Sequence, residues 1–305
     1  MTVPRPALAA LVVLVLASGA RPAAAQAWAP RERQGDVTFV TQMIDHIGRV
    51  FRDVRFDCCG TTNVGIGVDV DYGLSDRWSV SFSLPYVFAK YRGGPPDGPA
   101  AFLPYPAVDS CHCVHSTFQD VVLGSHYNLL KVRRSFSLMT SMSVGIPTHN
   151  YDYAGEAVVG FGLTELRMAT DVGEQLDFIV PGLSIDGHYG YTIAERVLGI
   201  SHNRSDALFT ASYTLPNRLG GHMILSGQRT YGGLRFPFEI EPFPERYLEF
   251  HRLLRDSYFQ AGIGVSYAWR DWDMSLSFLR TVSGDNTHNV HVYTVTAGRP
   301  FRIRR

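Results

Sequence analysis

Large apolar side chains alternate with small or polar ones between residues 78 and 88. The apolar set is Trp78, Val80, Phe82, Leu84, Tyr86 and Phe88. Serine fills most of the positions between them. Because successive strand side chains point to opposite faces, this alternation predicts a β-strand with one apolar face. The apolar face would pack on the core of a soluble sandwich, or contact lipid in a transmembrane barrel.

The same strand pattern recurs along the whole chain, whereas few segments suit a long helix. About twelve segments of this kind can be counted from the alternation and the flanking turn residues. They span residues 36–44, 64–72, 78–88, 118–129, 135–146, 160–170, 176–191, 207–215, 221–231, 258–269, 272–282 and 289–301.

The connections between these segments alternate between short and long. The short ones are GLSDR (73–77), LKVRR (130–134), DVGEQ (171–175), PNRLG (216–220) and RD (270–271). The long ones cover residues 45–62, 90–117, 147–159, 192–206 and 232–257. Outer-membrane barrels combine short periplasmic turns with long extracellular loops. The sequence therefore predicts one closed antiparallel transmembrane β-barrel of about twelve strands, with both termini on the periplasmic side.

The N-terminus has the pattern of a secretory signal peptide. Arg5 precedes the apolar run ALAALVVLVLA (7–17), and Ala23-Ala24-Ala25 fits a cleavage site. This pattern predicts a signal peptide over residues 1–25 and a barrel over residues 26–305, with an uncleaved anchor as the alternative. No later stretch approaches the roughly 18 consecutive apolar residues of a membrane-spanning helix.

Composition agrees with a barrel in the outer membrane of a Gram-negative type of cell. The net charge is +0, only 18% of residues are charged, and Gly (29), Tyr (15) and Phe (18) are abundant. A neutral chain is not expected to bind nucleic acid. The expected partner is the lipid bilayer. The last segment, NVHVYTVTAGRPF, is amphipathic with an aromatic near its end, like the signal that the barrel assembly machinery recognises.

Three motifs resemble those of the outer-membrane barrel family labelled MetA-pathway of phenol degradation. They are GLSDR (73–77) followed by LPYV (84–87), then FQD (118–120), then PTH (147–149). The first pair matches the family layout well. The second lacks the family's glycines, and the third has His149 in place of glycine. The resemblance covers most of the mature chain. It implies an outer-membrane barrel that passes small, often hydrophobic, molecules.

Four cysteines fall in two neighbouring long connections. Cys58 and Cys59 lie in the first, and Cys111 and Cys113 lie in the second. In an exported protein such cysteines usually form disulfides, so one or two bonds between these loops are expected. A metal site that adds His112 or His115 to the thiolates is the alternative.

Polar side chains at the positions between apolar ones are expected to face the barrel interior. The predicted lining residues are Asp69, Asp71, Asp120, His126, Glu165, Arg167, Asp186 and His188. Two interpretations stay open, because strand register is not visible in the sequence. These residues form either a wet interior with a charge network or a lining that selects solutes.

The connection 232–257 interleaves aromatic residues with glutamates. Its aromatic residues Phe236, Phe238, Phe243, Tyr247 and Phe250 suit a segment that folds into the mouth as a plug or gate. Packing of this loop onto its own neighbours is the alternative.

The sequence favours a channel over an enzyme. It contains no G-x-S-x-G, H-E-x-x-H or phosphate-loop motif, and no cofactor is expected. We predict passive passage of small solutes, hydrophobic or aromatic ones among them. A non-transporting structural or binding barrel is the main competing interpretation. A hydrolase with a site at the mouth is a third interpretation, and its candidate residues are Asp109, His112, His115, Asp152 and Asp256.

Overall fold

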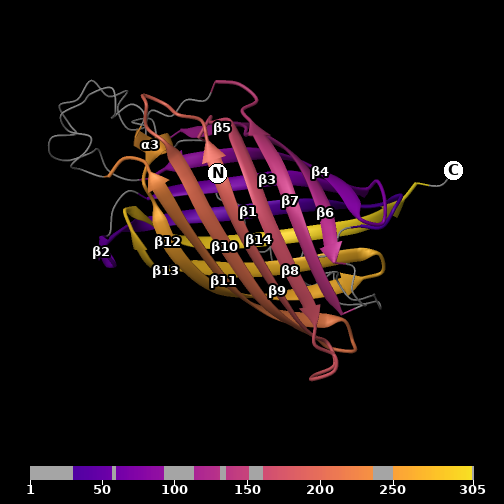
Figure 1. Ribbon diagram of the computed structural model, residues 1–305. Helices are drawn as coiled ribbons and strands as arrows, with labels where there is room; N and C mark the ends of the chain where they lie inside the picture. The colour runs from indigo at the N-terminus through magenta and orange to yellow at the C-terminus, as the bar shows by residue number, and fades with distance from the viewer. Residues whose placement is uncertain are drawn as a thin grey trace, which may run out of the picture.

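The computed structural model describes residues 30–56, 60–92, 113–130, 135–150, 161–235 and 250–303 (Figure 1). Twelve strands of this part form an antiparallel sheet that closes on itself. They are β1 (Gln34–Phe51), β3 (Thr61–Gly73), β4 (Trp78–Tyr91), β6 (Val121–Leu130), β7 (Phe136–Ile146), β8 (Glu165–Gln175), β9 (Leu183–Ala194), β10 (His202–Thr214), β11 (Leu219–Gly232), β12 (Ser257–Trp269), β13 (Trp272–Asp285) and β14 (Thr287–Arg302).

Pairing of β14 with β1 closes the barrel. The two strands pair from Gln34 opposite Arg302 to Val50 opposite Thr287, with a register shift between His46 and Gly48. Every other barrel strand pairs with its neighbours along the chain. The predicted closed antiparallel barrel is confirmed. A closed sheet leaves no unpaired backbone edge, which is what a strand protein in lipid requires.

The barrel is apolar on its outer face and polar on its inner face. In β4 the outward Trp78 is 50% exposed and the neighbouring Ser79 is 1% exposed. The same alternation exposes Phe39 on β1 and Ile263 on β12, and buries Thr192 on β9 and Thr281 on β13. An apolar outer band of this kind indicates that lipid, rather than water, surrounds the strands.

Pro85 lies where the neighbouring strand is interrupted. The short strand β5 (Val114–Phe118) pairs with Tyr86–Lys90 of β4, and β6 pairs with Trp78–Ser83. Leu84 and Pro85 fall between these two ladders. Gln119 N donates to Pro85 O at 2.9 Å across this break. Because proline has no N–H to donate to a ladder, this interruption is where a barrel strand tolerates it.

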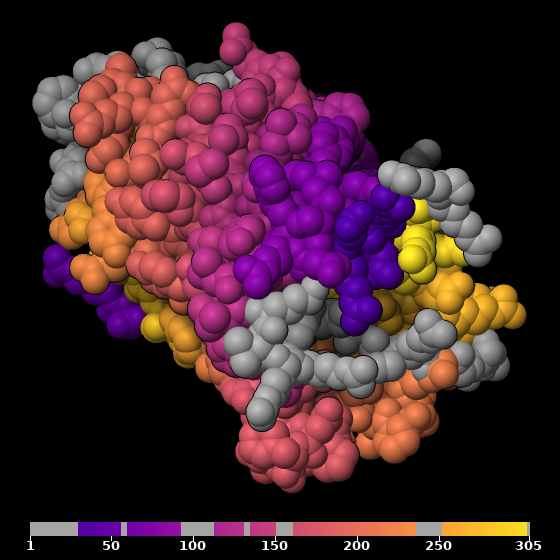
Figure 2. Space-filling view, turned by 45° about the vertical axis from the view of Figure 1, so that its right-hand side comes forward, coloured from indigo at the N-terminus to yellow at the C-terminus, as the bar shows by residue number. Residues whose placement is uncertain are grey.

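One predicted turn is wrong. Residues 171–175 belong to β8, and the connection to β9 is 176–182 instead. Gly182 takes a left-handed backbone (φ 86), and its N–H donates to Asp177 Oδ1 at 2.8 Å. The apolar run at Phe178–Val180 has the composition of a strand, yet Phe178 is 74% exposed at the tip. This turn, coloured between magenta and orange, projects at the lower edge of Figure 2.

The two rims of the barrel differ. The first barrel strand begins at Gln34 and the last ends at Arg302, both at the rim with the short turns. Figure 1 shows the C-terminus at this end and the helix α3 (Phe250–Leu253) and the short strand β2 (Val54–Phe56) at the other. Among the described residues, no helix has the length and apolar character needed to cross a membrane.

A small apolar cluster packs at the long-loop rim. It joins Leu234, Leu253 and Leu254 with Val197 and Ile200, and we call it the mouth cluster. Its backbone is fixed by Leu234 N donating to Leu253 O (2.7 Å) and Arg255 N donating to Leu234 O (2.9 Å). The mouth cluster therefore ties the base of the β11–β12 connection to the β9–β10 connection.

Candidate functional site

The strand register places most of the predicted lining residues on the inner face. Asp71 pairs with Ser81, Asp69 pairs with Ser83, and His126 pairs with the buried Ser79. Glu165, Arg167, Asp186 and His188 occupy the inward positions of β8 and β9. Asp120 lies in the break between β5 and β6. Whether these side chains select a solute remains a prediction.

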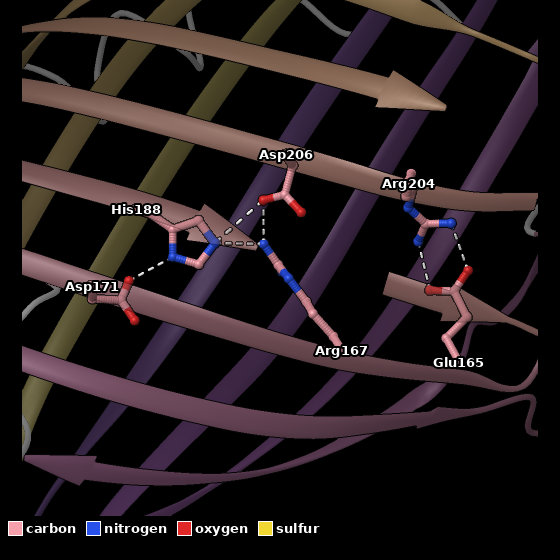
Figure 3. Close-up of polar contacts among 6 residues, drawn as sticks. All are labelled: Glu165, Arg167, Asp171, His188, Arg204 and Asp206. Atoms are coloured by element: carbon pink, nitrogen blue, oxygen red, sulfur yellow. Dashed lines mark hydrogen bonds and ion pairs between the residues drawn. The ribbon is translucent and has the colours of Figure 1, made fainter. Parts of the chain in front are cut away.

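Six ionisable side chains gather on the inner wall formed by β8, β9 and β10 (Figure 3). We call this group the wall cluster: Glu165, Arg167, Asp171, His188, Arg204 and Asp206. His188 Nδ1 donates to Asp171 Oδ1 at 2.5 Å, and Arg167 Nη2 donates to His188 Nε2 at 2.7 Å. Arg167 also forms an ion pair with Asp206, whose carboxylate lies 3.2 Å from His188 Nε2.

The second half of the wall cluster is a bidentate ion pair. Arg204 donates to Glu165 through Nη1 at 2.7 Å and through Nη2 at 2.5 Å. Both side chains are largely shielded from solvent. Two parallel hydrogen bonds fix the guanidinium plane, so this pair holds its geometry better than a single contact would.

Sequence reasoning missed half of the wall cluster. Arg204 and Asp206 fall in a predicted loop (192–206), and Asp171 falls in a predicted turn. In the structure β10 begins at His202 and β8 continues to Gln175. The usable signal is the continued alternation of Arg204 and Asp206 with the strand that follows, which a search for apolar side chains alone does not detect.

The wall cluster depends on a glycine beneath it. A Cβ at Gly190 of β9 would lie 2.8 Å from Asp206 Oδ1 and 2.9 Å from Arg167 Nε. The ion pair thus rests directly on the backbone of β9. A side chain at this position would require the ends of Asp206 and Arg167 to shift.

A cavity of about 530 Å³ lies against the wall cluster inside the barrel. The wall cluster forms one side, Gln228 and Tyr258 form another, and Val122 and Leu208 contribute apolar surface. Asp256 lies at the long-loop rim, where its Oδ1 accepts hydrogen bonds from Gln228 Nε2 (3.1 Å) and Thr230 Oγ1 (3.0 Å). Burial raises the pKa of the Asp256 carboxyl. This arrangement can hold or pass a small polar solute.

The inner face near the short-turn rim is acidic. Asp36 of β1 lies directly opposite Asp71 of β3. Two residues further along, Thr38 of β1 lies between Asp69 of β3 and Gly298 of β14. Gly298 pairs on its other side with Asp273 of β13. We call Asp36, Asp69, Asp71 and Asp273 the acidic patch. Among the described residues, no Arg or Lys forms an ion pair with this patch, and His126 Nε2 lies 3.9 Å from Asp71 Oδ1. Like charges placed opposite each other on one face repel, so the patch attracts cations.

The remaining predicted site residues lie mostly outside the described part of the chain. These are Cys58, Cys59, Cys111, Phe236, Phe238, Phe243 and Tyr247. Cys113 directly precedes β5. Phe250 is the first residue of α3, and only its backbone belongs to the described part of the chain. Disulfide formation and loop gating stay predictions. Within the described ranges, no group of three or more His, Cys, Asp or Glu side chains is arranged to hold a metal.

Comparison with known proteins identifies the fold. No family model and no curated protein matches the chain. The COG4313 outer membrane channel from Pseudomonas putida F1 matches with a TM-score of 0.68 at 11% identity, covering 92% of this chain and 100% of that chain.

Two further solved barrels match less well. The NanC porin has a TM-score of 0.47 at 9% identity, covering 87% of this chain and 98% of that chain. The CymD monoaromatic hydrocarbon channel has a TM-score of 0.43 at 8% identity, covering 90% of each chain. The fold of this chain is therefore that of an outer-membrane β-barrel, as the match to the COG4313 channel shows.

Proposed function

We propose that this protein is an outer-membrane channel for the passive passage of small solutes, and that it favours cations. The observation that supports this most is the acidic patch inside a closed barrel. Its carboxylates face one another without a guanidinium or ammonium partner among the described residues. Clefts lined by one sign of charge concentrate ions of the opposite sign.

The wall cluster complements this role because its charges largely cancel. Arg204 pairs with Glu165, and Arg167 pairs with Asp206. Matched pairs give the wall a fixed, water-binding surface without adding a strong field of either sign. We therefore expect the acidic patch to attract a permeating cation more strongly than the wall cluster does.

A small hydrophobic or aromatic solute is the second candidate. The resemblance to the MetA-pathway family suggests it, and Leu208, Val122 and Tyr258 supply apolar surface to the cavity. A non-transporting structural or binding barrel is the third candidate, and a hydrolase with a site at the mouth is the fourth. We further propose that residues 1–25 are removed on export and that β14 carries the sequence read by the barrel assembly machinery.

Ion selectivity tests the proposed function. The refolded barrel is inserted into a planar bilayer between KCl solutions that differ tenfold in concentration. We expect conductance, with a reversal potential of the sign that shows potassium preference. Replacing both Asp36 and Asp71 with Asn should move that potential towards zero. Asp271→Asn is the matched control, because Asp271 is exposed in the β12–β13 turn.

Each different result of these assays favours a different candidate. Chloride preference would contradict the assigned role of the acidic patch. Absence of ion conductance combined with uptake of phenol or toluene into liposomes would favour a channel for hydrophobic solutes. Absence of both conductance and uptake would favour a structural or binding barrel.

A further inference from the structure

A groove of about 460 Å³ runs along the outer wall where the barrel closes. Its lining comes from three strands, at outward positions except for Pro300: Val37, Phe39, Trp272, Arg299, Pro300 and Phe301. The first two belong to β1, Trp272 begins β13, and the rest end β14. The groove therefore lies at the short-turn rim, outside the barrel and away from the wall cluster.

The groove has an aromatic wall and a fixed aromatic end. The rings of Phe39 and Trp272 lie 6.4 Å apart at 32°. Phe301 stacks on Tyr72 of β3, with ring centroids 6.3 Å apart and planes 9° from parallel. Gly35 makes room for this stack, since a Cβ there would collide with the Phe301 ring. The groove is thus built from packed rings that the strands themselves hold in place.

Arg299 is the only charged side chain among the described residues that line this groove. Its guanidinium carbon lies 5.7 Å from the centre of the Trp272 ring, a cation–π distance. Arg299 is exposed, and the ion pairs found among the described residues do not include it. The Trp272 ring restrains the guanidinium and leaves its N–H groups available to a ligand.

We propose that this groove binds an anionic phospholipid of the periplasmic leaflet. Arg299 would contact the lipid phosphate, and one acyl chain would lie between Phe39 and Trp272. Guanidinium matches phosphate geometry through paired hydrogen bonds. The position fits the ligand, because the aromatic girdle of a barrel lies at the level of the lipid headgroups. The lipid would bridge β1, β13 and β14 and so brace the strands at the point of closure.

Native mass spectrometry tests this inference on the refolded, full-length mature barrel in detergent. Dioleoyl-phosphatidylglycerol is the anionic probe, and dioleoyl-phosphatidylcholine is the neutral one. We expect one phosphatidylglycerol to bind in preference to phosphatidylcholine. Arg299→Gln should weaken that binding roughly fivefold, the effect of about one basic side chain at a membrane surface.

Arg270→Gln is the matched control. Arg270 lies at the same rim and also faces a tryptophan, with 5.2 Å between its guanidinium carbon and the Trp269 ring, but it does not line the groove. This variant should bind phosphatidylglycerol like the parent. Phe39→Ala should weaken binding while keeping the charge. A difference in migration between unheated and boiled samples on SDS gels verifies that each variant is folded.

Four results would overturn the proposal. The first is equal loss in Arg270→Gln and Arg299→Gln, which would indicate diffuse attraction to a basic rim. The second is equal binding of the two lipids, which would remove the role of charge. The third is displacement of the lipid by inorganic phosphate alone, which would indicate an anion site without an acyl chain. The fourth is a dimer that forms in place of the lipid complex, which would assign the groove to a second copy of the chain.

Discussion

At the residue scale, the contacts inside the barrel depend on glycine positions as much as on charged side chains. Gly190 leaves the β9 backbone bare, and the Arg167–Asp206 ion pair lies directly on it. His188 then connects this pair to Asp171. The pair fills the space over this backbone, because a Cβ at position 190 would lie 2.8 Å from Asp206 Oδ1 and 2.9 Å from Arg167 Nε. The glycine is therefore part of the wall cluster's support although it has no charge.

Gly190→Ala should destabilise the barrel by about 1 kcal/mol, at the low end of the cost of overpacking, because only the flexible ends of Asp206 and Arg167 have to shift. The added methyl would lie 2.8–2.9 Å from atoms of Asp206 and Arg167. Urea unfolding in detergent measures the change. Gly65→Ala is the control, because a Cβ there meets Val87 at an ordinary 3.7 Å. Equal unfolding midpoints for the two variants would show that the ion pair adapts without strain.

At the element scale, the long-loop rim is held by packing and the short-turn rim by hydrogen-bonded turns. The mouth cluster buries Leu253 completely (0% exposed) and draws the end of α3 against the β9–β10 connection. Asn286 strengthens this arrangement by donating to Leu234 O (3.1 Å) and Arg255 O (2.8 Å). Asp256 anchors the next residues to β11. The base of the β11–β12 connection is thus fixed over the side of the mouth nearest the cavity.

Leu253→Ala should loosen this rim without unfolding the barrel. Removing a buried leucine side chain costs about 2–5 kcal/mol, and here the loss falls on the mouth cluster. We expect faster amide exchange in residues 250–256 and a larger single-channel conductance. Leu198→Ala, at a position 53% exposed in the same region, should change neither. Faster exchange with unchanged conductance would show that the mouth cluster does not narrow the channel.

At the scale of the whole molecule, the barrel could be predicted and its inner contacts could not. The alternation from Trp78 to Phe88 shows which face of the sheet each side chain occupies. The regular change between short and long connections indicates that the sheet closes into a barrel. Neither reports register, so the meeting of Arg204 with Glu165, two strands away, is not visible in the sequence. The apolar run at Phe178–Val180 resembles a strand because residue composition does not distinguish lipid-facing side chains from exposed ones at a turn.

Because the acidic patch and the wall cluster are separated, fixed charge is distributed asymmetrically along the barrel axis. Its uncompensated carboxylates lie near one rim, whereas the charges towards the other rim are matched. Such a pore rectifies current, because cations accumulate or deplete in it according to the direction of the voltage. In about 0.1 M KCl, where charges act over roughly 10 Å, currents at equal and opposite voltages should differ. In about 1 M KCl, where that range falls to roughly 3 Å, the difference should largely vanish. A current–voltage curve that is symmetric at both concentrations would contradict this polarity. If the polarity holds, the barrel would pass more current in one direction than in the other without any moving part.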